Sequence, residues 1–392
     1  MGPVRVPLIV LLCLASLGGT CSLGVFPSLL PEIGASARLP DWELGLVAAA
    51  FGFARMVSDV PIGLLVVRRL RGAFIAGPLV MTAGALLLAS ADALPTLIAG
   101  RALMGVGQAM NVMAGLTALL QYYAGRRLGA ALNAFEFSAM IGLLGGAGLA
   151  VVLPRGLSWS TVLLLACAPQ IIAVVLLPPT LAALRTGPAG VPPAGEPSDR
   201  FTGEGSRTVV GAAFVAGALI AITYTSIEQF IIPLRGSREF GLDRSGLARL
   251  FMAIQLGDLL ALLPVGVLSD RRGPARVLAG IALTLAAGAC LVGFGGPGTM
   301  ALGCVLFGVG MAGWMIPLSV LRRQTPAHLV GWRTALYRVG VDAGMFLGPF
   351  LSGLAGAEAL GSVAVTLGAA LAVVGILLLV LVRAGTPVCQ ES

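Results

Sequence analysis

The stretch Gly100-Arg-Ala-Leu-Met-Gly-Val-Gly-Gln-Ala109 recurs 203 positions later as Gly303-Cys-Val-Leu-Phe-Gly-Val-Gly-Met-Ala312. Two shorter matches share this offset: Pro61-Ile-Gly63 with Pro264-Val-Gly266, and Gly145 with Gly348. A constant offset across three pairs of apolar segments is hard to obtain by chance. It indicates that the chain consists of two related halves.

The composition of the chain places these halves in a membrane. Of 392 residues, 57% are hydrophobic and 11% are charged, and the mean hydropathy is +0.98. A soluble domain carries roughly 25% charged residues, so this chain could not cover itself with polar surface in water. The apolar runs are continuous, which excludes the alternating pattern of an outer-membrane barrel. The first run continues past Cys21 to Phe26, so we expect a membrane span there rather than a cleaved signal peptide.

Apolar runs bounded by charged residues, Pro and Gly predict twelve helices, each near the ~20 residues that a membrane span needs. They cover residues 6–28, 42–67, 73–91, 95–121, 129–153, 159–177, 208–232, 246–268, 276–295, 299–321, 333–356 and 361–382. We therefore predict an all-α membrane protein with two six-helix bundles related by a pseudo-twofold axis. The predicted domains are residues 1–178 and 208–392, joined by a Pro/Gly-rich cytoplasmic linker at 179–207.

The formal net charge of +8 reports on topology rather than on a nucleic-acid partner. Every basic residue is arginine. With the N-terminus in the cytoplasm, fifteen arginines near the span ends lie inside and five lie outside. We expect a multi-pass protein of the cell (inner) membrane with both termini cytoplasmic.

The segment after the eighth predicted helix, Gly266-Val-Leu-Ser-Asp-Arg-Arg-Gly-Pro-Ala-Arg276, resembles the loop signature G-x-L-x-D-R-x-G-R of the major facilitator superfamily. The matching residues are Gly266, Asp270, Arg271, Gly273 and Arg276. Arg101, Gly105 and Gly107 resemble the fourth-helix signature of the same family. In the first half, Val67 stands in the position of the loop aspartate.

Glycines in the fifth and eleventh predicted helices resemble part of a motif of drug–proton antiporters. They are Gly142, Gly145, Gly146 and Gly148 in the fifth helix, and Gly340, Gly344, Gly348 and Gly353 with Pro349 in the eleventh. The alternative interpretation is that these glycines only allow two helices to pack closely.

The resemblance implies a secondary transporter that works by alternating access, with a midplane cavity lined by helices one, four, seven and ten. We predict a proton-coupled exporter of small organic molecules. The alternatives are uptake or facilitated exchange of a metabolite, and a sensor or scaffold that kept the fold without transport. The expected partners are a small-molecule substrate, protons and the lipid bilayer, for a monomeric chain without a cofactor. The lone His328 and the absence of catalytic or metal-binding motifs argue against an enzyme.

Ionisable residues inside the predicted spans are the candidate functional residues, because each costs ~2.5–3.5 kcal/mol to insert. Arg101, Gln108 and Asn111 form one polar face of the fourth helix. The resemblance implies that this face lines the central cavity, where Arg101 would engage an anionic substrate or a carboxylate. For each charge, the alternative is a pair that only holds helices together.

Three further helices carry candidate carboxylates. Glu136 on helix five and Asp258 on helix eight, the latter with Gln255 one turn away, are predicted to approach each other. Two such carboxylates cannot both ionise cheaply in low dielectric, so the pair could carry the coupled proton. Tyr224 and Glu228 share a face of helix seven and could contact substrate. Alternatively, Glu228 reaches water at the interface.

Helices two and eleven each carry an arginine and an aspartate one turn apart: Arg55 with Asp59, and Arg338 with Asp342. The resemblance places these helices side by side and antiparallel. We therefore predict crosswise pairs, Arg55 with Asp342 and Asp59 with Arg338, that bridge the two halves.

Overall fold

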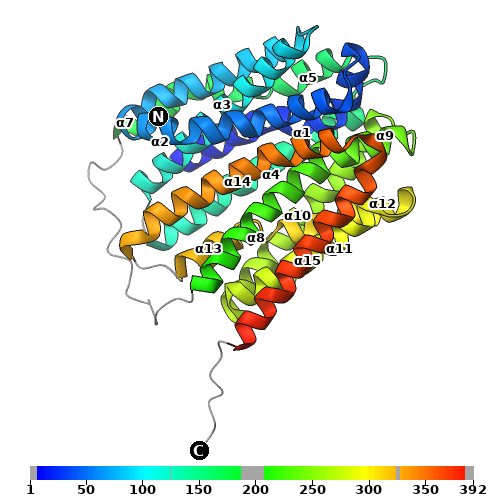
Figure 1. Cartoon of the computed structure of the whole chain (residues 1–392). Coiled ribbons are helices and arrows are strands. Elements are labelled where there is room, and N and C mark those ends of the chain that lie inside the picture. Colours follow the sequence, from blue (N-terminus) through cyan, green and yellow to red (C-terminus); the bar gives the residue numbers. More distant parts are fainter. Residues whose placement is uncertain (1–6, 124, 187–206, 324–326, 385–392) are drawn as a thin grey trace, which may run out of the picture. The chain divides into compact units, whose positions relative to one another are not determined.

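The computed structural model describes residues 7–123, 125–186, 207–323 and 327–384. Within these ranges every regular element is a helix (Figure 1), which confirms the all-α fold class. The chain divides into two compact units, and each is described by itself. The N-terminal unit comprises Met1–Glu196 and Gly241–Met252, and the C-terminal unit comprises Pro197–Phe240 and Ala253–Ser392.

The helices of the N-terminal unit are α1 (Leu8–Ala37), α2 (Asp41–Ala89), α3 (Leu94–Tyr122), α4 (Gly125–Val152), α5 (Trp159–Cys167), α6 (Gln170–Val175) and α7 (Leu177–Thr186). The first residues of α10 (Arg244–Arg272) also belong to this unit. Its two strongest helix pairs are α2 with α3 and α1 with α4.

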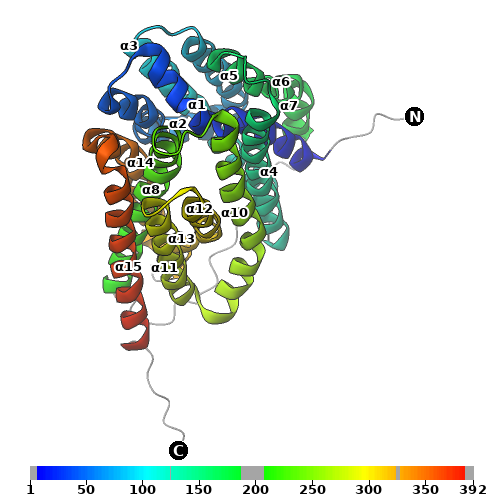
Figure 2. The ribbon, with the colours of Figure 1, turned by 90° about the vertical axis from the view of Figure 1, so that its right-hand side faces the viewer.

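The other helices of the C-terminal unit are α8 (Arg207–Ser226), the π-helix η1 (Ile227–Ile231), α9 (Ile232–Arg238), α11 (Pro274–Gly293), α12 (Pro297–Met311), α13 (Ile316–Arg323), α14 (Ala327–Ala355), the short η2 (Ala357–Ala359) and α15 (Leu360–Ala384). In this unit α11 packs along α12 and α15 (Figure 2), and α8 packs along α14.

Ten helical segments of the described residues are long and apolar enough to cross a membrane. One of them, α2, has 49 residues and is interrupted by the non-helical Arg69 (φ −138°, ψ 52°), so it supplies two spans. With α14, a 29-residue helix outside those ten segments, the described helices are consistent with the twelve predicted spans.

Two predicted boundaries are wrong. The sixth span runs from Trp159 to Leu184 as three consecutive helices, α5, α6 and α7, and so enters the segment predicted as the start of the linker, because the Pro and Gly cluster of that linker begins only at Gly187. Residues 187–206 of the predicted linker lie outside the described residues. The tenth predicted helix is not continuous, since a turn at residues 312–315 separates α12 from α13.

The recurring stretch Gly100–Ala109 forms a tight seam between neighbouring helices. A Cβ atom at Gly107 would lie 2.5 Å from the backbone nitrogen of Met81 on α2. In the second half, a Cβ at Gly310 would lie 2.6 Å from the Leu285 side chain on α11. A larger residue at either position would clash with the neighbouring helix, so the repeated motif marks equivalent helix contacts in the two units.

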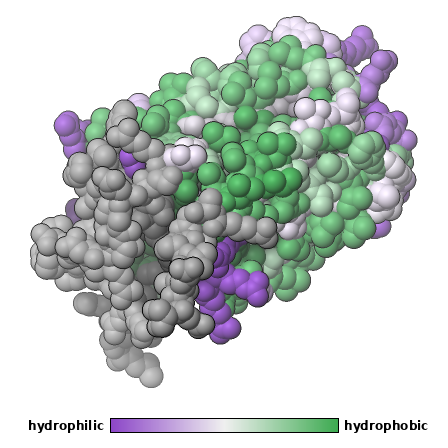
Figure 3. All heavy atoms as spheres, turned by 60° about the horizontal axis from the view of Figure 1, so that its bottom comes forward, coloured by the Kyte–Doolittle hydropathy of each residue, from purple (hydrophilic) through white to green (hydrophobic). Residues whose placement is uncertain are grey.

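Large apolar side chains lie on the outer surface, as expected of a protein in lipid. Figure 3 shows a face on which hydrophobic side chains predominate, with hydrophilic ones toward its margins. Three pairs at the offset of 203 are between 51% and 75% exposed: Val57 and Leu260, Val60 and Leu263, Leu64 and Val267. The duplication therefore extends to the pattern of exposure on α2 and α10.

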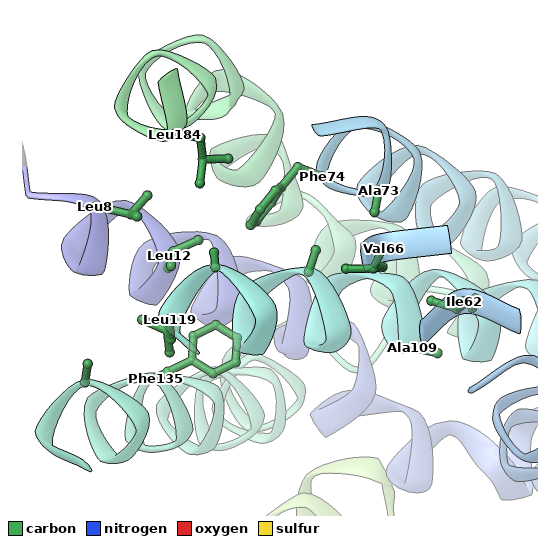
Figure 4. Packing of buried hydrophobic residues seen from close by; sticks show 13 residues of the cluster. Leu8, Leu12, Ile62, Val66, Ala73, Phe74, Ala109, Leu119, Phe135 and Leu184 are labelled. Atoms are coloured by element: carbon green, nitrogen blue, oxygen red, sulfur yellow. The ribbon is translucent and has the colours of Figure 1, made fainter. Parts of the chain in front are cut away.

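A buried cluster holds the N-terminal unit together where α1, α2, α3, α4 and α7 meet (Figure 4). Phe74 and Phe135 are its largest side chains, and Leu12 and Leu119 are almost completely buried. Burial of a side chain of this size contributes about 1.5–3 kcal/mol where the alternative is water.

Candidate functional site

The first candidate site lies in the C-terminal unit, where α8 passes into the π-helix η1. Such insertions are rare and often occur at functional sites. Glu228 lies in η1 and is only 4% exposed. This burial argues against the alternative that Glu228 reaches interfacial water.

A second carboxylate and an amide on α10 complete the polar part of this site. The amide nitrogen Nε2 of Gln255 donates to Oε1 of Glu228 at 3.3 Å. The Tyr224 hydroxyl also donates to the Glu228 carboxyl group, and the charge of Asp258 lies close enough to interact with it. The thiol of Cys304 on α12 also lies close enough to interact with the charge of Glu228. Glu228 and Gln255 are buried, whereas Asp258 is partly exposed. The structure thus unites Tyr224, Glu228, Gln255 and Asp258, which the sequence placed on two separate helices.

An aromatic pair borders the carboxyl group. Trp314 lies in the turn between α12 and α13, and its ring meets that of Tyr224 edge to face, with centroids 5.8 Å apart and an interplanar angle of 61°. Both rings are partly exposed. We name Tyr224, Glu228, Gln255, Asp258 and Trp314 the carboxyl–aromatic cluster.

The carboxyl–aromatic cluster departs from the internal repeat. In the first half, α1 corresponds to α8 with η1, and α3 corresponds to α12 with α13. Both α1 and α3 are continuous, whereas the second half has the π-helix η1 after α8 and a turn between α12 and α13. At the offset of 203, Glu228, Asp258 and Trp314 correspond to Val25, Arg55 and Asn111. The N-terminal unit folds without a carboxylate at either position, so the common architecture does not require this pair.

Arg101 on α3 lies in an aromatic setting that the sequence did not reveal. Its guanidinium carbon is 3.5 Å from the ring centroid of Phe26 and 4.7 Å from that of Phe51. Arg101 is 3% exposed, and the guanidinium of Arg55 also lies near the Phe51 ring, at 5.9 Å. The buried charge is therefore stabilised in part by cation–π contacts. No spacing rule links Phe26, Phe51 and Arg101, which come from three helices.

Gln108 and Asn111 have different surroundings from Arg101. Both line a cavity inside the N-terminal unit with about 540 Å³ of empty space, including the solvent at its mouth, and Arg101 is not among the lining residues. Asn111 also donates weakly to the sulfur of Met81 at 3.8 Å. The polar stripe predicted on this helix thus divides into a packed cation and two amides that face a cavity.

Comparison with known protein families accounts for this architecture. The sequence profile of the Major Facilitator Superfamily matches residues 8–236 and, in a second match, residues 209–390. The chain belongs to the Major Facilitator Superfamily. No curated protein sequence matches it.

Solved structures of this superfamily share the fold at low sequence identity. A glutamate-to-glutamine variant of the peptide transporter POT, in complex with sulfate, has a TM-score of 0.78 at 16% identity, over 96% of this chain and 94% of that chain. A variant of the nucleoside transporter NupG has a TM-score of 0.75 at 13% identity, over 95% and 99% of the two chains. A bacterial homologue of the human lysosomal transporter Spinster has a TM-score of 0.68 at 15% identity, over 96% of each chain.

The superfamily-like loop motif lies at the turn from α10 to α11. Gly273 adopts φ +84°, a left-handed conformation that favours glycine, and its carbonyl accepts from the backbone of Val277 at 3.3 Å. Asp270, Arg271 and Arg276 are exposed around this turn. The motif thus reverses the chain while presenting charges at its surface. Gly266 lies one helical turn before Asp270, with open space beside it.

The glycines that resemble the antiporter motif pack helices together. A Cβ at Gly344 of α14 would lie 2.9 Å from the carbonyl oxygen of Ala218, and one at Gly348 would lie 2.6 Å from that of Ile222, both on α8. These two glycines therefore serve close packing of α14 on α8. The resemblance to antiporters rests on sequence alone.

The remaining predicted charges lie in separate units. Asp59 and Asp342 are buried, Arg55 and Arg338 are partly exposed, and Glu136 is exposed on α4. The predicted pairing of Glu136 with Asp258, and the crosswise arginine–aspartate pairs, each join one unit to the other. They stay predictions.

A charge cluster that the sequence did not suggest holds the start of α10 in the N-terminal unit. Arg244 donates to both carboxylate oxygens of Glu32, at 2.8 and 2.5 Å, and to the carbonyl of Leu157 at 2.8 Å. Asp243 pairs with Arg155 at 3.0 Å and accepts from the backbone nitrogen of Gly246. The hydrogen bond from Gly246, more than the nearby arginines, lowers the pKa of Asp243. Arg244 and Glu32 are 212 positions apart, so no local pattern could have paired them.

Proposed function

We propose that this protein is a proton-coupled secondary transporter that exports small organic molecules by alternating access. In this proposal it is a monomer of the inner membrane, with both termini in the cytoplasm. Membership of the superfamily supports transport, and the arginine distribution supports the orientation. The observation that carries proton coupling is the buried carboxyl group of Glu228, which accepts a hydrogen bond from Gln255 at 3.3 Å and lies near a second carboxylate, Asp258.

The chemistry of the pair follows from its surroundings. In low dielectric two neighbouring carboxylates cannot both ionise cheaply, so one proton is held between them. Gln255 orients the Glu228 carboxyl group through its hydrogen bond, and partly exposed Asp258 offers a route by which the proton can leave. Changing access to the pair from one side of the membrane to the other would then load and release that proton. Glu136 remains an alternative partner of Asp258.

The direction of transport and the substrate are the finer parts of the proposal. The partial antiporter motif of α14 supports export. The peptide and nucleoside transporters among the structural neighbours support small polar organic molecules as the class of cargo. Uptake or exchange of a metabolite is the second candidate, and a scaffold without transport is the third.

The test uses the full chain in liposomes that contain a pH-sensitive dye. A thermal-shift screen of a metabolite and drug library first identifies a ligand, since a ligand at 100 times its Kd stabilises by ~2.7 kcal/mol. We expect a gradient of that ligand to move protons in the opposite direction. Glu228→Gln and Asp258→Asn should abolish proton movement while ligand binding stays measurable, and exposed Glu358→Gln is the matched control.

Each outcome discriminates. Proton movement that survives in both variants would refute the carboxylate pair as the proton site, and loss in Glu136→Gln with Asp258→Asn would favour the alternative pair. Ligand flux without protons would favour facilitated exchange, and flux in the same direction as protons would favour uptake. Binding without any flux would support the scaffold.

A further inference from the structure

We propose that the turn in the middle of α2 binds the headgroup of an anionic phospholipid. Arg68, Arg69 and Arg71 hold the phosphate, and the acyl chains lie on exposed apolar side chains beside the turn. We name these three residues the arginine turn. The proposal goes beyond the proposed function, since it depends neither on the substrate nor on the coupled ion.

The arginine turn lies at a boundary between membrane and water. The chain leaves the helical conformation at Arg69, and the parts of α2 on both sides of this residue are the two spans that α2 supplies. Non-helical backbone is not tolerated in the hydrocarbon of a bilayer, so a turn between two spans lies at the depth of the lipid headgroups. All three arginines are exposed there.

Apolar side chains fix this turn on its inner face. Val66, Ala73 and Phe74 are buried in the cluster of the N-terminal unit, and Leu70 packs against that cluster (Figure 4). These four residues flank the arginines along the chain, so the packing of the apolar set leaves the arginines at the surface. The backbone of the turn is thereby held in place before a lipid binds, which lowers the ordering cost of binding.

No acidic side chain neutralises the arginine turn. Between Asp59 and Asp92 the chain has no Asp or Glu, and the three arginines are the only ionisable residues of this interval. Within the part of the chain that the structure describes, none of them pairs with a carboxylate. The Cα atoms of Arg68 and Arg71 are at most ~11 Å apart, so the three side chains can reach one headgroup. Because guanidinium groups match phosphate oxygens in a two-pronged geometry, a phosphate is the anion that suits this turn.

The internal repeat shows that this excess of positive charge is particular to the first half. At the offset of 203, the first two arginines of the turn correspond to Arg271 and Arg272, which are likewise exposed. An exposed aspartate, Asp270, stands beside them at the position of Val67, and a proline stands at the position of the third arginine. The aspartate repels an anion, so the second turn attracts a phosphate less strongly. It therefore supplies a matched control within the same chain.

Exposed apolar side chains beside the arginine turn favour a lipid over a free phosphate. Leu64 and Val67 lie one helical turn apart on the span before it, and are 65% and 72% exposed. Ile75 and Leu79 lie one helical turn apart on the span after it, and are 41% and 52% exposed. An acyl chain can cover such side chains while its phosphate contacts the arginines, whereas a free anion gains nothing from them.

The test titrates the detergent-purified full chain with dioctanoyl phosphatidylglycerol, with zwitterionic dioctanoyl phosphatidylcholine and with inorganic phosphate, and measures binding by native mass spectrometry. Each arginine near an anionic headgroup contributes roughly fivefold in affinity. We therefore expect phosphatidylglycerol to bind at least about tenfold more tightly than phosphatidylcholine, and inorganic phosphate to bind more weakly than phosphatidylglycerol. Phosphate binding as tight as that of phosphatidylglycerol would assign the site to a free anion, and equal binding of the two lipids would exclude selection by charge. Either result would overturn the proposal.

Matched variants locate the site. Arg68→Gln combined with Arg69→Gln should weaken phosphatidylglycerol roughly tenfold or more, whereas Arg271→Gln combined with Arg272→Gln should have little effect. Val67→Asp, which gives the first turn the aspartate of the second, should weaken this lipid roughly fivefold, and the neutral Val67→Asn should not. All five positions are exposed, and thermal unfolding without lipid checks that each variant is folded. Equal effects of the two arginine pairs, or of Asp and Asn at position 67, would overturn the proposal.

Discussion

Replacement of Arg101 by lysine tests whether the contacts of its guanidinium group with Phe26 and Phe51 stabilise the N-terminal unit. The substitution keeps the positive charge and removes the planar group that lies over Phe26 and Phe51 at 3.5 and 4.7 Å. A lysine ammonium is a compact, strongly hydrated charge that can lie over one ring at most. Because Arg101 is 3% exposed, water cannot replace the lost contact.

The size of the effect follows from the two contacts. A desolvated cation–π contact is worth up to ~2 kcal/mol, and a more distant one ~0.5–1 kcal/mol. If lysine keeps the weaker share, the free energy of unfolding falls by about 2 kcal/mol. For a unit of ~150–250 residues this corresponds to a Tm lower by ~4–8 °C. Membrane expression should persist, and transport should be strongly impaired.

The assay is a double-mutant cycle read by thermal unfolding in detergent. Phe26→Leu is introduced into the wild type and into Arg101→Lys, and the contact predicts that the second substitution costs less once the first is present. Arg155→Lys, at a surface pair whose arginine side chain is 79% exposed, is the matched control and should change stability little. Additive effects in the cycle, or wild-type stability and flux in Arg101→Lys, would refute the reasoning.

Three further predictions concern other contacts. Gly344→Ala should lower the free energy of unfolding by about 1–3 kcal/mol in thermal unfolding, because the new Cβ would lie 2.9 Å from the Ala218 carbonyl oxygen. Gly340→Ala, which has open space beside it, should be neutral or stabilising, and equal costs of the two substitutions would contradict the close packing of α14 on α8. Because the pKa of Asp243 is lowered, its charge stabilises the fold above the unfolded-state pKa, and this stabilisation is lost as pH falls through the folded-state pKa. Asp243→Asn should remove this fall of Tm at acidic pH while keeping the helix cap, whereas Asp243→Ala should cost about 1 kcal/mol more. A fall of Tm at acidic pH in Asp243→Asn equal to that of the wild type would refute the assignment. Arg55→Asp or Asp342→Arg alone should cripple folding or transport, with a cost of ~3–5 kcal/mol, and the double swap should recover much of it, unless each arginine is satisfied on its own helix.

The sequence by itself determined the class of the fold and the number of spans. Hydropathy acts over ~20 residues at a time, so each helix could be predicted from its own segment. The offset of 203 predicted the duplication, and the glycine seams at Gly107 and Gly310 show why the repeated stretch matters. The loop motif after α10 could also be predicted from the sequence, and its Gly273 adopts the left-handed backbone that favours glycine.

The breaks within helices could not be predicted from the sequence, because the π-helix η1 and the turn at 312–315 change the hydropathy very little. Sequence reasoning found Arg101, Glu228 and Asp258 one at a time, from the cost of a charge in the membrane. It could not say that Phe26 and Phe51 enclose Arg101, or that Asp258 acts on Glu228.

Membership of a site was decided only by the tertiary structure, because residues that meet there come from different helices. Arg244 and Glu32 are 212 positions apart, yet their side chains form a bidentate ion pair. Helical periodicity predicts which residues share a face, whereas which faces meet depends on how whole helices pack. For this reason the sequence could predict the charged residues of this transporter, and only the packing of α8, α10 and α12 could join Glu228, Asp258 and Trp314 in one cluster.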